Sequence, residues 1–159
     1  MKGSKKVLDQ LNELLKGELT AADQYFVHSE MYNDWGLGDL YERLHHEFEE
    51  ELEHAKKLIE RILFLEGVPQ VGARDPLLIG TDVPTMLQND LKSELSVVAA
   101  LKKAIRICEE EQDYQSREIL VSLLEDTEED HTYWLEKQLG LIEKMGLENY
   151  IQSKASSNT

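Results

Sequence analysis

The sequence has 159 residues, 41% of them hydrophobic, which suits one domain with a sizeable core and is too short for two well-packed domains. Its 32 acidic and 17 basic residues give a formal net charge of −15, which repels phosphate backbones and anionic lipid headgroups. We therefore expect neither nucleic acid nor a membrane surface as a partner. Only nine Gly and three Pro are present, and so few chain breaks favour an all-α fold.

Cys108 is the only cysteine, which excludes an intrachain disulfide, a Cys-x-x-Cys pair and a thiolate-rich metal site within one chain. We interpret Cys108 as a small core residue in a reducing compartment. The basic segment 1–6 is not followed by a continuous apolar stretch, and no apolar run is long enough to span a membrane. We therefore expect a cytoplasmic protein.

The first half of the chain contains two helical patterns. Helical periodicity covers residues 5–34, and after the Gly-Leu-Gly break at 36–38 it covers residues 39–66. Residues 67–82 then carry repeated Gly, Pro and Asp, which indicates one long connection. A connection of this length can cross a helical bundle instead of joining antiparallel neighbours.

The second half predicts two further long helices and a short one. The third helix covers 83–112, with Asp82 as its N-cap and Pro84 in its first turn. The fourth covers 114–145 and ends at Gly146, and a short fifth helix follows at about 147–152. Residues 1–159 are thus expected to form a single four-helix domain with one long crossover loop.

Each long predicted helix carries one glutamate on its apolar stripe, where residues follow one another at steps of three and four. These glutamates are Glu18, Glu51, Glu94 and Glu128. An ionised carboxylate in an apolar core is very costly, so each must be neutral, paired with a base, exposed by helix rotation, or bound to a cation. Four of them at corresponding positions favour bound cations.

Two of these glutamates are followed by a histidine one turn later, namely His54 after Glu51 and His131 after Glu128. Glutamates from two helices and Glu-x-x-His from the other two are typical of di-iron and di-manganese carboxylate bundles. The spacing repeats within the chain, because Glu51 follows Glu18 by 33 residues and Glu128 follows Glu94 by 34. A further Glu-x-x-His ends at His45, off the stripe, and is interpreted as a solvent-facing pair.

Such hard and borderline ligands suit Fe(II), Mn(II) or Zn(II), and iron would add redox chemistry. We hypothesise that one iron is held by Glu18, Glu51 and His54 and the other by Glu94, Glu128 and His131, with Glu51 and Glu128 as bridges. Dioxygen or peroxide would take electrons from two ferrous ions and leave ferric iron. Tyr25, one stripe step further along, could hydrogen-bond a ligand, donate an electron or simply fill the core.

The sequence also resembles the bacterioferritins and the related bacterial ferritins, nearly from end to end. The similar stretches are MKG at 1–3, QYF at 24–26, NDWGL at 33–37, IERILFLEG at 59–67 and MGLENY at 145–150. The resemblance implies a ferritin-like fold, a hollow shell of 24 chains, a ferroxidase centre in each subunit and a ferric mineral in the cavity. It also implies an inner-surface iron site at His46 and Glu50, and a small ferredoxin as electron donor for iron release.

One departure from this family concerns haem. Bacterioferritins bind haem between paired subunits through a methionine in the Glu-x-x-His turn of the second helix, and this sequence has Leu52 there. Leucine has no donor atom, so we expect no haem b in a homopolymer. A mixed shell with a methionine-bearing, haem-binding subunit stays open.

A second departure lies in the fourth helix, where segment 124–128 is one residue longer than in the haem-binding members. The extra residue can be absorbed as a π-bulge, a feature often found at functional sites. The extra residue leaves the positions of Glu128 and His131 less firmly set by spacing than those of Glu51 and His54, and Glu125 is the alternative ligand to Glu128.

Three other functions fit parts of this pattern. Another di-iron carboxylate oxidase or peroxidase would share the ligand chemistry, although rubrerythrins add cysteine pairs that this chain lacks. A non-catalytic shell subunit would bind metal only structurally, and a helical binding module would bind none. Shell mass, ferrous oxidation and retained mineral distinguish these from an iron-storing ferroxidase.

Overall fold

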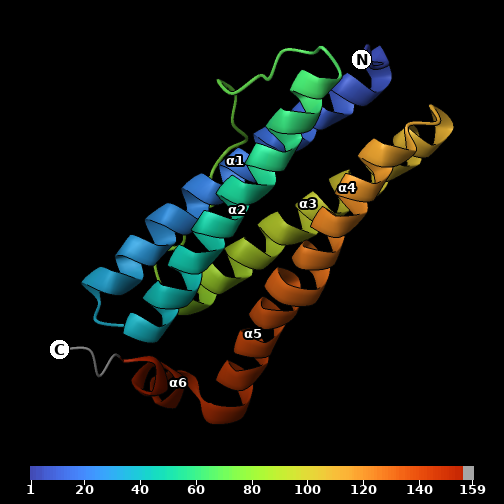
Figure 1. The fold of residues 1–159 in the computed structure, drawn as a ribbon. Coiled ribbons are helices and arrows are strands. Elements are labelled where there is room, and N and C mark those ends of the chain that lie inside the picture. The colour runs from blue at the N-terminus through green and yellow to red at the C-terminus, as the bar shows by residue number, and fades with distance from the viewer. Residues whose placement is uncertain (156–159) are drawn as a thin grey trace.

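All regular secondary structure is helical in the part of the chain that the computed structural model describes, residues 1–155. The last four residues of the predicted domain lie outside it. The elements are α1 (Lys5–Asp34), α2 (Gly38–Phe64), α3 (Val83–Glu110), α4 (Tyr114–Glu125), the π-helix η1 (Asp126–Thr132), α5 (Tyr133–Met145) and α6 (Leu147–Lys154). α4, η1 and α5 follow one another without a break and form the fourth rod of the bundle (Figure 1). The predicted all-α bundle with a short C-terminal helix is confirmed.

The helices begin and end at local sequence signals. Asp82 and Thr85 form a capping box at the start of α3, where Asp82 was the predicted N-cap. Gly146 ends α5 with a φ of 81°, a conformation that glycine adopts at little cost. The predicted second and third helices, however, extended two residues past the observed C-terminal ends. Glu66 (φ 62°) and Gln112 (φ 58°) are left-handed, so α2 and α3 end before them.

The crossover between α2 and α3 runs along α1, as Figure 1 shows. Its backbone N–H groups donate to side chains spaced along that helix: Asp75 to Thr20 (2.9 Å), Leu78 to Gln24 (3.0 Å) and Gly80 to His28 (3.1 Å). These bonds satisfy backbone donors that a loop would otherwise have to expose to water. The crossover therefore returns the chain to the far end of the bundle, where α3 begins.

Two apolar clusters fill the bundle, one toward each end. The first contains Leu11, Leu15, Leu58 and Leu101, and the second contains Tyr32, Leu44, Leu87 and Tyr150, together with other buried residues. On α1 the first cluster ends at Leu15 and the second begins at Ala21, with the buried Glu18 between them. The buried carboxylates therefore lie at the level where the two apolar clusters meet.

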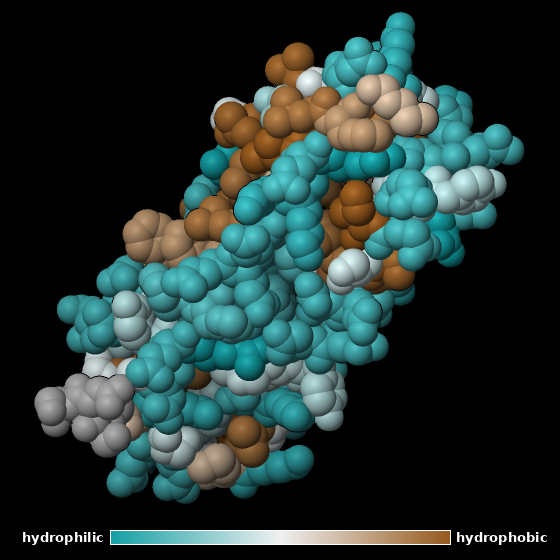
Figure 2. All heavy atoms as spheres, viewed as in Figure 1, coloured by the Kyte–Doolittle hydropathy of each residue, from teal (hydrophilic) through white to brown (hydrophobic). Residues whose placement is uncertain are grey.

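The outer surface is largely hydrophilic in the view of Figure 2, with most hydrophobic surface gathered in its upper half. No helix within residues 1–155 is both long and apolar enough to cross a membrane.

Candidate metal centre

Five of the predicted ligands come together in the middle of the bundle. Glu18, Glu51, Glu94, His54 and His131 arrive from α1, α2, α3 and η1, and each is at most 3% exposed. They form two groups, Glu18 with Glu51 and His54, and Glu51 with Glu94 and His131, and within each group the possible ligand atoms lie within 4.8 Å of one another. Glu51 belongs to both groups and is therefore placed to bridge two metal ions.

Both histidines turn Nδ1 toward these glutamates. His54 Nδ1 lies 3.3 Å from Glu18 Oε2 and 3.7 Å from Glu51 Oε2. His131 Nδ1 lies 3.0 Å from Glu51 Oε1 and 3.6 Å from Glu94 Oε1. One oxygen of Glu51 therefore faces each histidine, and the two imidazoles occupy equivalent places on either side of it.

The other nitrogen of each ring faces an outer carboxylate. His54 Nε2 lies 3.2 Å from Asp126 Oδ2. His131 Nε2 lies 2.6 Å from Glu50 Oε2, with hydrogen-bonding geometry, and also 2.6 Å from Glu47 Oε2. A histidine that binds metal through one nitrogen usually donates its other N–H to such a partner, which fixes the ring and its tautomer. Both rings thus have the arrangement expected of metal ligands.

Several buried polar atoms at the centre have no hydrogen-bond partner. They are Glu18 Oε1, Glu51 Oε2, Glu94 Oε2 and His131 Nδ1, whose 3.0 Å approach to Glu51 Oε1 does not have hydrogen-bonding geometry. An orphaned carboxylate oxygen in a protein interior is strongly unfavourable, and such atoms are rare. Together they match the oxygen and imidazole ligands that Fe(II) accepts, so the residues present fit a pair of such ions.

The electrostatics of the metal-free centre favour protons on these groups. Burial and the neighbouring Glu51 raise the pKa of Glu18 well above its usual range. Burial acts against charging His54, but contacts with Glu18 and Glu51 outweigh it and raise its pKa to about 11. The pKa of His131 is raised for the same reason, by Glu47, Glu51 and Glu94 against burial. Protons therefore supply the positive charge that metal ions would otherwise bring.

The Glu128 side chain does not face the interior of the bundle, as the sequence predicted it would. The apolar stripe predicted that it faces inward, but its side chain is exposed, and so is that of the alternative ligand Glu125. The reason is η1, which confirms the predicted π-bulge. Because a π-helix closes i→i+5 hydrogen bonds, its turns are wider than α-helical ones, and residues three apart no longer share a face. His131 therefore stays inside while Glu128 turns outward.

Tyr25 is fully inside the centre. Its hydroxyl donates to Glu94 Oε1 at 2.5 Å. Burial and the Glu94 carboxylate raise the pKa of Tyr25 well above its usual range, so the hydroxyl keeps its proton. The structure thus supports hydrogen bonding to a predicted ligand as the role of Tyr25.

Glu47 was missed in the sequence. It is 2% exposed, and together with Glu50, Asp130 and His131 it forms a further group of possible metal ligands. The sequence could have indicated its burial, because Glu47 lies four residues before Glu51 and three after Leu44, at the spacing of one helix face. Phe48, four residues after Leu44, fits the same spacing and competes with Glu47 for the stripe, but Phe48 is only partly buried and stacks on Phe26, with 5.0 Å between ring centroids.

The remaining predicted positions lie at the surface of α2. His46 Nε2 pairs with Glu50 Oε1 at 2.8 Å, and the His46 side chain is 58% exposed. The two residues matched to an inner-surface iron site are therefore in contact, and Glu50 also reaches His131. Leu52 is 43% exposed on the same helix and contributes an apolar side chain to its surface.

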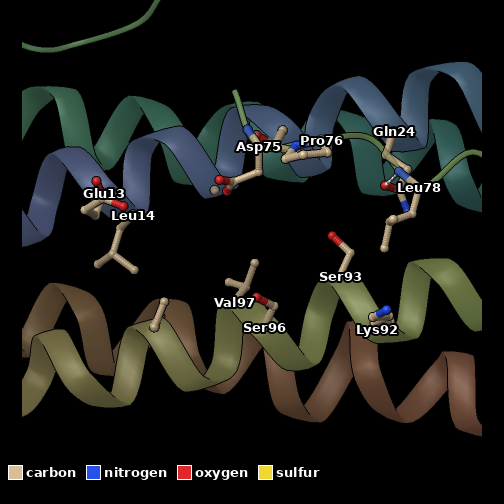
Figure 3. Close-up of a pocket in the computed structure, with 13 residues that line it drawn as sticks. Glu13, Leu14, Gln24, Asp75, Pro76, Leu78, Lys92, Ser93, Ser96 and Val97 are labelled. Atoms are coloured by element: carbon tan, nitrogen blue, oxygen red, sulfur yellow. Dashed lines mark hydrogen bonds between the residues drawn. The ribbon is translucent and has the colours of Figure 1, made fainter. Parts of the chain in front are cut away.

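A pocket of about 340 Å³ lies between α1, α3 and the crossover (Figure 3). Its α3 wall includes Ser93, Ser96 and Val97, and the opposite wall includes Gln24, Asp75 and Leu78. Residue 93 directly precedes Glu94. The pocket therefore reaches the backbone that carries one of the central glutamates from the crossover side of the bundle.

Comparison with known proteins agrees with this helical bundle and its buried glutamates. The ferritin-like domain family matches residues 8–145. The chain belongs to this family. It is 61% identical to a bacterial ferritin of Synechocystis over 156 residues, which cover 98% of this chain and all of that protein.

Two further relatives define its place in the family. A bacterial ferritin of Pseudomonas aeruginosa is 59% identical over 154 residues, covering 97% of this chain and 99% of the relative. A bacterioferritin of Brucella melitensis is 43% identical over 156 residues, covering 98% and 96%. The family resemblance read from the sequence is thereby confirmed, and the bundle described above is a ferritin-like fold.

Proposed function

We propose that this chain is an iron-storage subunit that oxidises Fe(II) at the buried centre and passes Fe(III) to a mineral. The observation that carries this is the layer of buried glutamates and histidines, with orphaned oxygens, at the level where two apolar clusters meet. A bundle built only for stability has no reason to place several carboxylates with unpartnered oxygens there. Similarity to bacterial ferritins supports iron as the metal.

In this proposal each ferrous ion has its own histidine. Glu18, Glu51 and His54 hold one ion, and Glu51, Glu94 and His131 hold the other, which follows the two groups of ligand atoms. Glu51 is the bridge. Glu128 belongs to the ligand set only if iron turns the π-helix inward, and Glu125 has the same exposed starting position.

Binding of iron must displace protons from the centre, since metal ligands are deprotonated carboxylates and neutral imidazoles. His54, with its pKa of about 11 without metal, and Glu18, with its raised pKa, would release theirs. Two ferrous ions would then give two electrons to one dioxygen, which takes up two protons and leaves as hydrogen peroxide, or to one hydrogen peroxide, which takes up two protons and gives two waters. Tyr25 would hold Glu94 in place during these steps.

Around this chemistry we propose a homo-oligomeric shell of 24 subunits in the cytoplasm, without haem b when formed by this chain alone. A mixed shell with a haem-binding subunit and a ferredoxin that supplies electrons for iron release are further proposals from family resemblance. His46 and Glu50 would take iron up on the inner surface. Their contact at 2.8 Å supports a shared site.

The test combines mass with turnover. Size-exclusion chromatography of the purified chain gives the shell mass, and ferrous oxidation is then followed optically at known iron per subunit, with retained iron measured after desalting. We expect a shell of about 24 subunits, fast oxidation of two Fe(II) per subunit, and retained mineral. A small oligomer that oxidises iron without keeping it would indicate a different di-iron oxidase or peroxidase. A shell that does not oxidise iron would indicate a structural subunit.

A further inference from the structure

Arg43 on α2 reaches across the bundle to the rod that contains the π-helix. Its Nε donates to Glu47 Oε1 at 2.7 Å, and its Nη2 donates to Asp130 Oδ1 at 2.9 Å. Its guanidinium carbon also lies 4.8 Å from the centre of the Trp134 ring, within the range of a cation–π contact. One side chain thus joins α2 to both η1 and α5.

These contacts surround His131. Asp130 directly precedes it, Trp134 follows it by three residues, and Glu47 Oε2 lies 2.6 Å from its Nε2. Arg43 therefore fixes the chain on both sides of this histidine, and it also fixes a carboxylate that faces the ring.

The turn that carries His131 has reason to need such support. π-Helices are rare and occur mainly as single turns inside α-helices, often at functional sites. η1 also places Glu128, Glu129 and Asp130 next to one another, and like charges repel. Glu47, at 2% exposure, is a buried carboxylate that would be strongly destabilising without a cationic partner. Arg43 places a positive charge next to both the buried Glu47 and the acidic η1 turn.

We propose that Arg43 is a positioning residue of the metal centre, which acts through Glu47 and Asp130 to hold His131 with Nδ1 toward Glu51 and Glu94. The inference rests on the proposed function, since His131 is taken as an iron ligand. Its effect is confined to one half of the centre. The outer partner of the other histidine, His54, is Asp126, whose side chain is half exposed at 50% and which Arg43 does not contact in the described structure.

The experiment is a Co(II) titration of the metal-free protein, followed by visible absorption, which reports ligand binding without any oxidation. Wild-type protein is expected to bind two Co(II) per subunit in two steps. In Arg43→Gln the step assigned to His131 should weaken by roughly 10- to 100-fold, the usual effect of losing an outer partner of a metal ligand. The step assigned to Glu18 and His54 should stay within about twofold.

Arg61 provides a matched control on the same helix. Its Nε donates to Ser116 Oγ at 2.7 Å, its Nη2 donates to Asp113 Oδ1 at 3.0 Å, and its guanidinium carbon lies 4.7 Å from the Phe64 ring centre. Arg61→Gln thus loses the same kinds of contact at a distance from the centre. It should lower Tm while leaving both Co(II) steps unchanged.

A second variant covers the case in which Arg43→Gln does not fold. Asp130→Asn keeps Arg43 and its pairing with Glu47, so it should fold and weaken the His131 step less than Arg43→Gln does. Unchanged Co(II) steps in the folded variants, or equal weakening of both steps, would overturn the role of Arg43. A third Co(II) equivalent appearing in Arg43→Gln would also overturn it, because Arg43 would then be excluding a cation from Glu47, Glu50 and Asp130. Wild-type protein that binds no Co(II) pair would instead overturn the proposed centre itself.

Discussion

The imidazole rings of His54 and His131 lie nearly parallel, 5.8 Å apart between centroids and 14° between planes, although they come from different rods of the bundle. Glu51 faces both rings through different oxygens. The centre therefore consists of two similar halves that share the Glu51 carboxylate. A substitution should affect one half or both, depending on which half the residue belongs to.

Substituting the central glutamates should therefore give distinct patterns. Glu18→Ala should weaken one Co(II) step and Glu94→Ala the other, whereas Glu51→Ala should weaken both. Each should slow Fe(II) oxidation by at least about tenfold, since even outer partners of a ligand contribute that much. Glu53→Ala, an exposed glutamate on the same helix, is the matched control and should oxidise iron normally. Unchanged oxidation in both Glu18→Ala and Glu94→Ala would sink the ligand assignment.

The π-helix gives a second prediction. In the full chain Glu128→Ala should leave the Co(II) steps unchanged, because this side chain is exposed, whereas Asp126→Ala should weaken the His54 step by about tenfold. Both effects are measured by the same titration. A large loss in Glu128→Ala would mean that metal binding turns η1 inward and restores the ligand predicted from spacing.

Deleting Thr127 tests the cause of this geometry. The residue is fully buried within η1, and its removal should convert the π-turn to α-helix and bring Glu128 onto the face of His131. Glu128→Ala should then slow Fe(II) oxidation in the deletion background and not in the full chain. Equal effects in the two backgrounds would show that the π-helix does not decide the orientation of Glu128.

The orientation of the central glutamates could be predicted from the sequence in the regular helices but not in the π-helix. The stripes placed Glu18, Glu51 and Glu94 inside because α1, α2 and α3 are regular α-helices, in which steps of three and four keep one face. The same rule failed for Glu128, since an inserted residue changes the helical phase by an amount that only the backbone hydrogen bonds reveal. The presence of a π-bulge could be anticipated from length, but its effect on Glu128 could not.

The outer carboxylates were missed for a different reason. Asp126 approaches His54 from a rod distant in sequence, and a stripe on one helix carries no information about its neighbour. Glu47 lies at stripe spacing on α2, so its burial could be expected, but its approach to His131 on η1 could not. Arg43 is likewise unremarkable as a charged residue at helical spacing from Glu47. Its contact with Asp130, 87 residues later, appears only once the rods are packed.

Stability without metal should fall as pH rises. The pKa of His54 is raised from 6.5 to about 11 in the folded protein, so the folded state holds a proton that the unfolded chain releases. The protonated His54 contributes fully to the free energy of unfolding below pH 6.5, and this contribution is lost as pH rises toward 11. The raised pKa of Glu18 acts in the same direction from lower pH. Tm measured with a chelator should therefore decrease from pH 6.5 to 10, and less steeply in His54→Gln.

Saturating metal should change this dependence. Ligands must be deprotonated to bind, so metal affinity rises with pH, and the bound ions add stability by mass action. The gap in Tm between metal-loaded and metal-free protein should widen from pH 6.5 to 9. A gap that narrows over this range would contradict the proton displacement proposed for His54 and Glu18.

The haem prediction depends on Leu52. Its side chain is 43% exposed on α2 and has no donor atom, so this chain purified alone should show no strong Soret band of methionine-ligated haem. Leu52→Met adds a thioether at that place and should gain a Soret band in proportion to added haem. Leu63→Met, at 57% exposure on the same helix, adds the same group elsewhere and should gain none. A strong methionine-type spectrum in the wild-type chain would mean that another side chain ligates haem, and equal gains in the two variants would show that position 52 has no special role.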